Sequence, residues 1–239
     1  MIGGIVGLAA GAVATLGAQA ALNGAGNKAP TSRAEVEQII HDYILEHPEI
    51  LPQAMEKLQQ KRMGAAIDDK RSVIETPYRG AWEGAKDGDV TLVEFFDYAC
   101  GYCRASLPDL ARLVREDKGL KVVYRELPIL SEESGAAARV SLLAAEQDKY
   151  MPYHRALYAA GRVTRDTVLA SAQKAGIDRK AAEKAIGDAS YTGEIESNIK
   201  LAQAIGASGT PTFVIGNKVL AGAVGYDALK AAIAEARKK

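Results

Sequence analysis

Apolar positions divide the chain into stretches with different periods. Residues 1–20 are apolar, small and uncharged, whereas residues 33–58 carry apolar side chains at helical spacing. Between them, residues 21–32 are rich in Gly, Asn, Ala and Pro and predict a linker. From residue 73 onward, short apolar runs and long helical patterns follow one another. The pattern therefore predicts a leader, a helical arm and a mixed α/β domain.

The leader has two interpretations. Ala18-Gln19-Ala20 has the A-x-A form that signal peptidase cuts, which favours a cleaved secretory signal in residues 1–20, although Lys and Arg are missing from its start. Gly3, Gly7 and Gly11 repeat at the spacing of a helix-packing face, so residues 2–22 could instead form a retained membrane anchor. Both interpretations predict a periplasmic or otherwise exported protein, where disulfides persist.

The arm is predicted from residue 33 to residue 72. Ser32 and Glu35 have the spacing of a capping box, and Pro48 fits the first turn of a second helix. The two helices carry apolar stripes that need a partner, which favours self-association. The charged stretch 59–71 is expected to be a solvated continuation into a linker or flexible helix.

The domain after residue 73 is predicted as α/β. Strands are expected at 90–96, 120–127, 212–215 and 218–221, the last two forming a hairpin around Gly216-Asn217. Residues from about 131 to 205 are helical and Ala-rich, too long for a simple crossover, and a helix at 226–237 closes the chain.

Aromatic residues in this domain are first interpreted as packing groups. Trp82 is expected to supply buried area. A group in the middle of the helical region could line a substrate groove, but a packed helix is the favoured interpretation for Met151, Tyr153, His154 and Tyr158.

Both cysteines of the protein lie in Cys100-Gly101-Tyr102-Cys103, where the 90–96 strand passes into a helical pattern. A thiol at a helix N-terminus faces unpaired backbone N–H groups and the positive end of the helix dipole, which favour the thiolate. Cys100 is therefore predicted to be a nucleophile, and Cys103, one helical turn on, to resolve a mixed disulfide.

A zinc site and a purely structural disulfide are less favoured interpretations of the two cysteines. A zinc site would need further ligands, but the chain has no other cysteine, and its three histidines show no ligand-like spacing.

The charges of the chain balance, with Lys+Arg and Asp+Glu at 30 each. No net charge therefore attracts nucleic acid, and nucleic acid is not expected as a partner.

The motifs resemble a known superfamily. Val93-Glu94-Phe95-Phe96, the Cys100–Cys103 tetrapeptide and Gly209-Thr210-Pro211-Thr212-Phe213 are similar to the thioredoxin-fold DsbA/DsbC disulfide oxidoreductases, and especially to ScsC-like (suppressor of copper sensitivity) proteins. This resemblance implies a thioredoxin fold with an inserted helical subdomain, preceded by an N-terminal helical arm that forms a homo-oligomer, with a trimer as the guess. It also implies protein substrates with thiols or disulfides and a membrane redox partner that reduces the site. No cofactor is expected beyond the redox-active disulfide.

The resemblance also assigns roles around the cysteines. Pro211 is implied to be a cis proline packed against the disulfide, leaving the backbone of Thr210 free to bind substrate, although an ordinary trans turn stays open. Glu94, on a strand expected to be buried, would have a raised pKa and exchange a proton with Cys103, unless it faces solvent.

The dipeptide Gly101-Tyr102 and Thr210 match the isomerase DsbC rather than oxidase-type sites. The expected function is therefore a protein disulfide isomerase acting through Cys100 and Cys103. Alternatives are a DsbA-like dithiol oxidase, a protein that binds copper(I) through Cys100 and Cys103, and a holdase.

Overall fold

The computed structural model describes residues 32–238 of a chain that divides into two compact units, residues 1–55 and 56–239. The predicted leader, and the linker up to residue 31, lie outside the described residues. Within the described range, no helix is both long and apolar enough to cross a bilayer.

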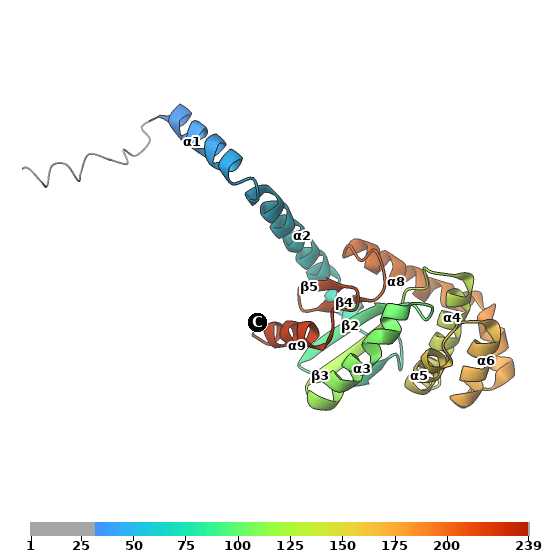
Figure 1. The fold of residues 1–239 in the computed structure, drawn as a ribbon. Coiled ribbons are helices and arrows are strands. Elements are labelled where there is room, and N and C mark those ends of the chain that lie inside the picture. Colours follow the sequence, from blue (N-terminus) through green and yellow to red (C-terminus); the bar gives the residue numbers. More distant parts are fainter. Residues whose placement is uncertain (1–31, 239) are drawn as a thin grey trace, which may run out of the picture. The chain divides into compact units, whose positions relative to one another are not determined.

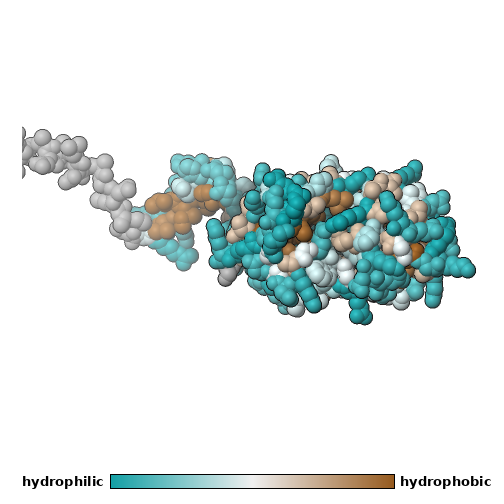
Figure 2. Space-filling model, turned by 90° about the horizontal axis from the view of Figure 1, so that it is seen from below, coloured by the Kyte–Doolittle hydropathy of each residue, from teal (hydrophilic) through white to brown (hydrophobic). Residues whose placement is uncertain are grey.

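The described part of the first unit is helical. Helix α1 (Arg33–Glu46) starts with the predicted capping box, in which Ser32 Oγ accepts the Glu35 N–H and the Glu35 carboxylate accepts the Ser32 N–H. Helix α2 (Ile50–Glu75) begins after Pro48 and crosses the border between the units. None of the α1 residues is buried, and the apolar side chains of this arm gather in a visible patch (Figure 2). Exposed members are Val36, Ile39, Ile40, Tyr43, Leu45, Leu51 and Met55.

The rest of α2 belongs to the second unit. The stretch 59–71, expected to be a solvated linker or flexible helix, is helical, because α2 continues unbroken to Glu75. Most of its charged side chains are exposed, but it buries Ile67 completely, as the end of α2 does Ile74. The charged residues around them had hidden this narrow apolar face.

The second unit is built on a five-stranded sheet in the order β1-β3-β2-β4-β5. Strands β2 (Val90–Phe96) and β3 (Leu120–Glu126) run parallel, whereas β1 (Trp82–Gly84), β4 (Thr212–Ile215) and β5 (Lys218–Ala221) pair antiparallel with their neighbours. The four predicted strands are confirmed. The short β1 was not predicted, and its Trp82 is only partly buried, packed against the core on the α2 side.

Helices cover both faces of the sheet, as the ribbon shows (Figure 1). Helices α3 (Gly101–Glu116) and α9 (Tyr226–Ala236) pack on one face, whereas α8 (Thr192–Ala204) packs on the other with the end of α2. The predicted helical insertion is confirmed and lies between β3 and β4. Before α8 it consists of α4 (Glu132–Glu146), α5 (Tyr150–Ala160), α6 (Arg165–Lys174), α7 (Arg179–Ile186) and the 3₁₀ turn η1 (Ala189–Tyr191).

The two faces hold separate cores because strand side chains alternate. Leu92 and Phe96 of β2, with Val122 and Tyr124 of β3, join the core that also holds both cysteines. Val93, Phe95 and Val123 point to the opposite core, with α2 and α8.

Arg125 ties the end of α2 to this second face. Its buried guanidinium donates to three carbonyls at the end of the helix, those of Val73, Ile74 and Thr76. It also reaches the Glu194 carboxylate at 3.0 Å and the Asn198 side chain at 3.1 Å, both on α8. A helix end leaves its last carbonyls without partners, so Arg125 caps α2 from within the sheet.

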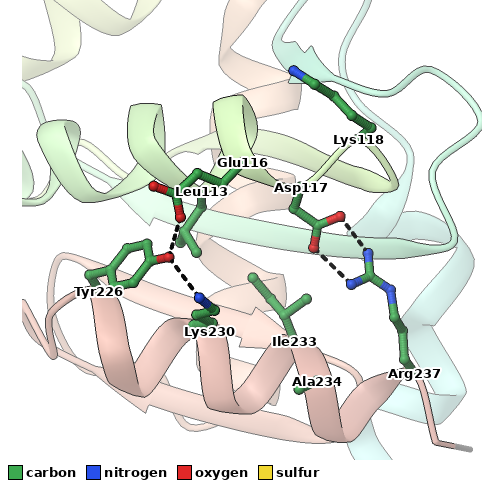
Figure 3. A pocket seen from close by; sticks show the side chains of 9 residues that line it. All are labelled: Leu113, Glu116, Asp117, Lys118, Tyr226, Lys230, Ile233, Ala234 and Arg237. Atoms are coloured by element: carbon green, nitrogen blue, oxygen red, sulfur yellow. Dashed lines mark hydrogen bonds and ion pairs between the residues drawn. The ribbon is translucent and has the colours of Figure 1, made fainter.

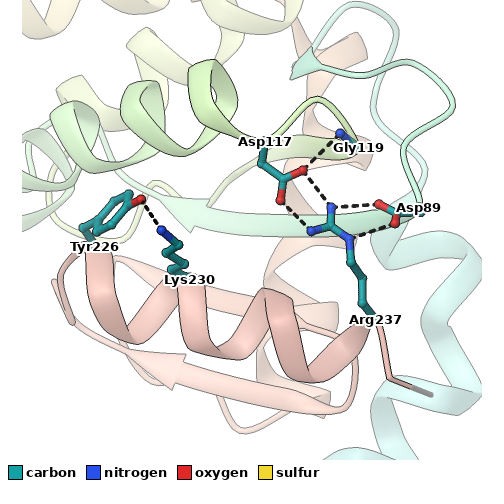
Figure 4. A network of polar contacts seen from close by, with 6 residues as sticks. All are labelled: Asp89, Asp117, Gly119, Tyr226, Lys230 and Arg237. Atoms are coloured by element: carbon teal, nitrogen blue, oxygen red, sulfur yellow. Dashed lines mark hydrogen bonds and ion pairs between the residues drawn. The ribbon is translucent and has the colours of Figure 1, made fainter.

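A second set of polar contacts holds α9 in place; we call the contacts of Arg237 with Asp89 and Asp117 the Arg237 clasp. Arg237 donates to Asp89 and Asp117 through paired N–H···O bonds of 2.8–2.9 Å (Figure 4). The Asp117 carboxylate also accepts the Gly119 N–H, and Lys230 donates to the Tyr226 hydroxyl. The basic end of α9 thus pins it to the turns that follow α3 and precede β2.

Candidate active site

Cys100 is the N-cap of α3, at the point where the chain leaves β2. Its sulfur accepts the N–H of Cys103 at 3.4 Å, and its thiol donates to the Thr210 carbonyl at 3.2 Å. The residue is 5% exposed. A sulfur in this place receives an N–H and the positive end of a sixteen-residue helix, both of which favour negative charge on it.

Cys103 lies one turn further into α3 and is more deeply buried. Burial, and secondly the neighbouring Glu94 carboxyl, raise the pKa of this thiol. Both cysteines are free thiols. Both cysteines are buried in the same core, but Cys100 caps α3 whereas Cys103 lies within the helix.

Glu94 is 1% exposed, so the alternative of a solvent-facing Glu94 is wrong. It sits in the central strand, paired with Tyr124 on one side and Phe213 on the other. Burial, followed by the negative charge that Cys100 can carry, raises its pKa well above the usual value. Within residues 32–238, neither carboxyl oxygen has a hydrogen-bond partner, which favours the neutral form.

The Thr210–Pro211 peptide bond is cis, as the resemblance implied. Pro211 is buried and leads directly into β4. The Thr210 carbonyl contacts the Cys100 sulfur, so a loop 110 residues later in the sequence meets the nucleophile. The structure thus brings together Cys100, Cys103, Thr210 and Pro211, with Glu94 beneath them.

The dipeptide between the cysteines faces outward. Tyr102 is 70% exposed, and a Cβ atom placed on Gly101 would meet nothing within 4 Å. Both positions are therefore open to substitution without repacking.

Two buried acids near the site were not found by sequence reasoning. Asp97 follows β2 directly and is 1% exposed. Glu126 ends β3 on the same face as Glu94, and burial raises its pKa too. The alternation of β3, which puts Tyr124 and Glu126 on the face of Val122, was a usable signal for Glu126.

The aromatic group of the helical region is packed, as favoured. Tyr153, His154 and Tyr158 are buried in α5, and the His154 ring lies 5.0 Å from that of Phe96. Burial, with nearby Arg155, lowers the pKa of His154 to about 3. His154 is therefore a neutral core residue, hydrogen-bonded through Nδ1 to the Tyr98 hydroxyl at 3.1 Å.

Two hollows lie at opposite ends of α3. One, of about 350 Å³, is enclosed by the last turn of α3 and by α9 (Figure 3), roughly 24 Å along the helix from Cys100. The other, of about 490 Å³, includes Ala99 and Arg104 beside the nucleophile and reaches Arg162 and Thr164. Of these two hollows, the second lies next to Cys100 in the sequence, since Ala99 and Arg104 line it.

Comparison with protein families matches two parts of the chain. Residues 91–234 match the DSBA-like thioredoxin domain, and residues 33–63 match the N-terminal domain of the copper resistance protein ScsC. The first match covers both cysteines, Glu94, Thr210 and Pro211.

Solved structures agree with this assignment. A thioredoxin-like oxidoreductase from Silicibacter pomeroyi is 38% identical, with a TM-score of 0.66 over 70% of this chain and 97% of its own. A linker-deletion variant of Proteus mirabilis ScsC is 26% identical, with a TM-score of 0.68 over 88% and 98%. The thiol-disulfide exchange protein α-DsbA2 from Wolbachia pipientis is 25% identical, with a TM-score of 0.67 over 74% and 97%.

The curated relatives that match this chain are Na(+)/H(+) antiporters, and the match covers only part of each. Residues of this chain are 29% identical over 163 positions to the Na(+)/H(+) antiporter NhaA 3 of Salinispora tropica, covering 67% of this chain but 25% of the antiporter. This chain therefore spans about a quarter of the length of the curated relatives it matches.

Proposed function

Because the chain belongs to the DSBA-like thioredoxin domain family, and is a thiol–disulfide oxidoreductase of the DsbA/ScsC type, we propose that it acts as a protein disulfide isomerase through Cys100 and Cys103. The observation that carries the proposal is the asymmetry of the two thiols. Cys100 caps a helix beside the Thr210 carbonyl, whereas Cys103 is held in the core above Glu94.

In the first step, the Cys100 thiolate attacks one sulfur of a non-native disulfide in the substrate protein. The substrate S–S bond breaks, a Cys100–substrate S–S bond forms, and the electron pair leaves with the second substrate sulfur as a thiolate. The N–H of Cys103 and the end of α3 stabilise the attacking sulfur until it reacts.

The mixed disulfide then has two outcomes. In isomerisation, another substrate thiolate attacks it, which forms a new substrate disulfide and returns Cys100 as a thiolate with no net redox change. In the second outcome, the Cys103 thiolate attacks the Cys100 sulfur of the mixed disulfide. This releases reduced substrate and leaves a Cys100–Cys103 disulfide. A dithiol supplied by a membrane redox partner must then reduce that disulfide, so this partner belongs to the proposal.

Glu94 accepts the proton of Cys103 and later returns it. Burial raises the pKa of Glu94, so its carboxylate, when ionised, is a strong enough base to accept the proton that the Cys103 thiol releases. In the reverse direction, neutral Glu94 returns the proton when the disulfide is reduced.

Gly101, Tyr102 and Thr210 favour isomerisation over oxidation, because these identities match DsbC at the positions that tune redox poise. Thr210 and Pro211 are proposed to line the place where a substrate strand pairs. The exposed apolar side chains of the arm favour self-association, with a trimer as the expected assembly, in which several nucleophiles would surround one substrate. The proposed location is the periplasm or another exported compartment.

The test is reactivation of a protein with scrambled disulfides, run beside oxidation of the same protein fully reduced. We expect reactivation to dominate, to vanish in Cys100→Ala, and to give a trapped mixed disulfide in Cys103→Ser. A matched variant changes Gly101 to Pro and Tyr102 to His. The open space at Gly101 and the start of the helix accommodate these changes. We therefore expect this variant to oxidise the reduced protein better than the unmodified protein does, with unchanged stability.

Strong oxidation with weak reactivation by the unmodified protein would instead identify a dithiol oxidase. Full activity of Cys100→Ala would remove the mechanism altogether.

A further inference from the structure

Asp97 has an unusual set of contacts for a buried acid. Its Oδ1 accepts the N–H of Ala99 at 2.8 Å, and its Oδ2 accepts the N–H groups of Ile129 and Leu130 at 2.9 and 3.0 Å. All three donors are backbone groups from two different loops. One loop leads into Cys100, and the other connects β3 to α4. The carboxylate therefore ties two main-chain segments 32 and 33 residues apart.

The backbone of the same residue contacts the cysteine region. Its carbonyl accepts the N–H of Cys100 at 3.0 Å and the hydroxyl of Tyr158 at 3.1 Å. Its backbone N–H partly offsets the burial that raises the pKa of Cys103. These contacts are made by the Asp97 backbone, so variants that change only its side chain keep them and test the carboxylate alone.

The tethered loop is joined through Asp97 to the loop that leads into Cys100, and it is apolar on its outer side. Ile129 is 47% exposed and Leu130 is 54% exposed, although their N–H groups are bound inside the protein. Large apolar side chains held outward by fixed backbone are suited to contact an unfolded protein segment. Their position relative to Cys100 depends on the carboxylate that both loops share.

We propose that Asp97 is a positioning residue for thiol–disulfide exchange. Its carboxylate holds the Ile129–Leu130 loop against the loop of Cys100, so that a protein substrate resting on the first loop presents its disulfide to the sulfur on the second. The proposal rests on the exchange activity proposed above and adds a determinant of how protein substrates, rather than small disulfides, reach Cys100.

Asp97→Asn and Asp97→Ala in the full chain separate positioning from simple stability. Asparagine keeps one acceptor oxygen but places an NH₂ group against a backbone N–H, so it must lose part of the tether. We expect kcat/KM for a scrambled protein to fall about 10-fold in Asp97→Asn and further in Asp97→Ala, chiefly through KM, because the loop on which the substrate rests is no longer held in place. Reduction of a small aromatic disulfide by the same folded variants should change less than about twofold, since it needs no loop contact.

Amide hydrogen exchange gives a readout independent of activity. We expect the N–H groups of Ile129 and Leu130 to exchange at least about 10-fold faster in Asp97→Asn, because their acceptor is weakened. Asp178→Asn is the matched control: Asp178 also accepts a backbone N–H, from Ala181 at 2.9 Å, but at the start of α7. It should alter neither kinetic measurement nor the exchange of Ile129 and Leu130.

Equal losses with protein and small disulfides, or unchanged exchange at Ile129 and Leu130 in Asp97→Asn, would overturn the inference. If Asp97→Ala does not fold, Asp97→Asn decides alone. If the unmodified protein proves inactive on protein disulfides, the proposed function fails, whereas the exchange of these two amides still tests the tether.

Discussion

At the scale of single residues, the two buried cysteines differ in the contacts that they make. Cys100 and Cys103 are three residues apart, yet Cys100 caps α3 beside the Thr210 carbonyl, whereas Cys103 lies within the helix and its pKa is raised by burial. Glu94 is buried without a hydrogen-bond partner in the described part of the chain, an arrangement that costs stability. A group kept at such cost is a reasonable candidate for chemistry, and its cost can be measured.

Glu94→Gln should stabilise the protein at neutral pH and slow resolution. The folded pKa of Glu94 lies above its usual value, so the folded state holds a proton that the unfolded chain releases above pH 4.5. Stability is therefore lost as pH rises from 4.5 toward the folded pKa, by up to about 1.4 kcal/mol per pH unit. We expect the melting temperature of Glu94→Gln to exceed that of the unmodified protein by an amount that grows as the pH rises above 4.5.

The same variant should slow release of a Cys100 mixed disulfide by Cys103 about 100-fold in single-turnover experiments, because the proton acceptor is gone. Unchanged resolution would contradict the role of Glu94, whatever the stability shows.

His154→Phe should make the protein less sensitive to acid. The folded pKa of His154 is lowered to about 3 from the usual 6.5, so below pH 6.5 the unfolded chain takes up a proton that the folded protein does not. Stability falls across the window from pH 6.5 to 3, by up to about 1.4 kcal/mol per pH unit. Chemical denaturation of both proteins at several pH values in that window should show a shallower decline for the variant, and parallel curves would refute the assignment.

At the scale of elements, β2 and α3 position the two cysteines, and the loop before β4 contacts Cys100 through the Thr210 carbonyl. The sequence predicted these parts because a buried strand, a Cys-X-X-Cys helix start and a Thr-Pro before a strand leave local signals. It missed β1, which has only three residues, and the core face of α2, where Ile67 stands among charges. The tether at Asp97 was beyond sequence reasoning, because nothing local indicates which loop will lie beside another.

Arg237→Lys tests the clasp on α9. Lysine keeps the charge but cannot make paired bonds to both Asp89 and Asp117, so we expect a melting temperature lower by roughly 2–4 °C. Exchange activity should stay unchanged, because the clasp lies at the far end of α3. Arg179→Lys, in an exposed pair with Glu183 on α7, is the control and should have almost no effect. A similar shift in both variants would show that paired geometry is irrelevant.

At the scale of the whole molecule, the border between the units falls inside α2. The last turns of this helix supply Ile67 and Ile74 to the core and are capped by Arg125, so they are part of the second unit. The exposed apolar side chains before the border belong to the arm. A fragment that keeps the catalytic fold must therefore begin well before the predicted position 73.

A fragment starting at Glu56 should keep its fold and its reduction of small disulfides but lose self-association. Light scattering should then show a monomer, and reactivation of scrambled protein should fall several-fold as the other nucleophiles are removed. A fragment starting at Val73 is the comparison, and the loss of Ile67 should lower its melting temperature markedly. Self-association of the Glu56 fragment would place the contact outside the arm.

The position of Trp82 determines what intrinsic fluorescence can reveal. It is the chain's single tryptophan, and it packs with the core that contains α2 and α8, whereas both cysteines belong to the core on the other face of the sheet. Emission from this indole should therefore respond little when the thiols are oxidised, and strongly when the end of α2 detaches. Redox titrations of this protein need a thiol-specific signal, and the tryptophan is free to serve as an optical marker for the α2 contact.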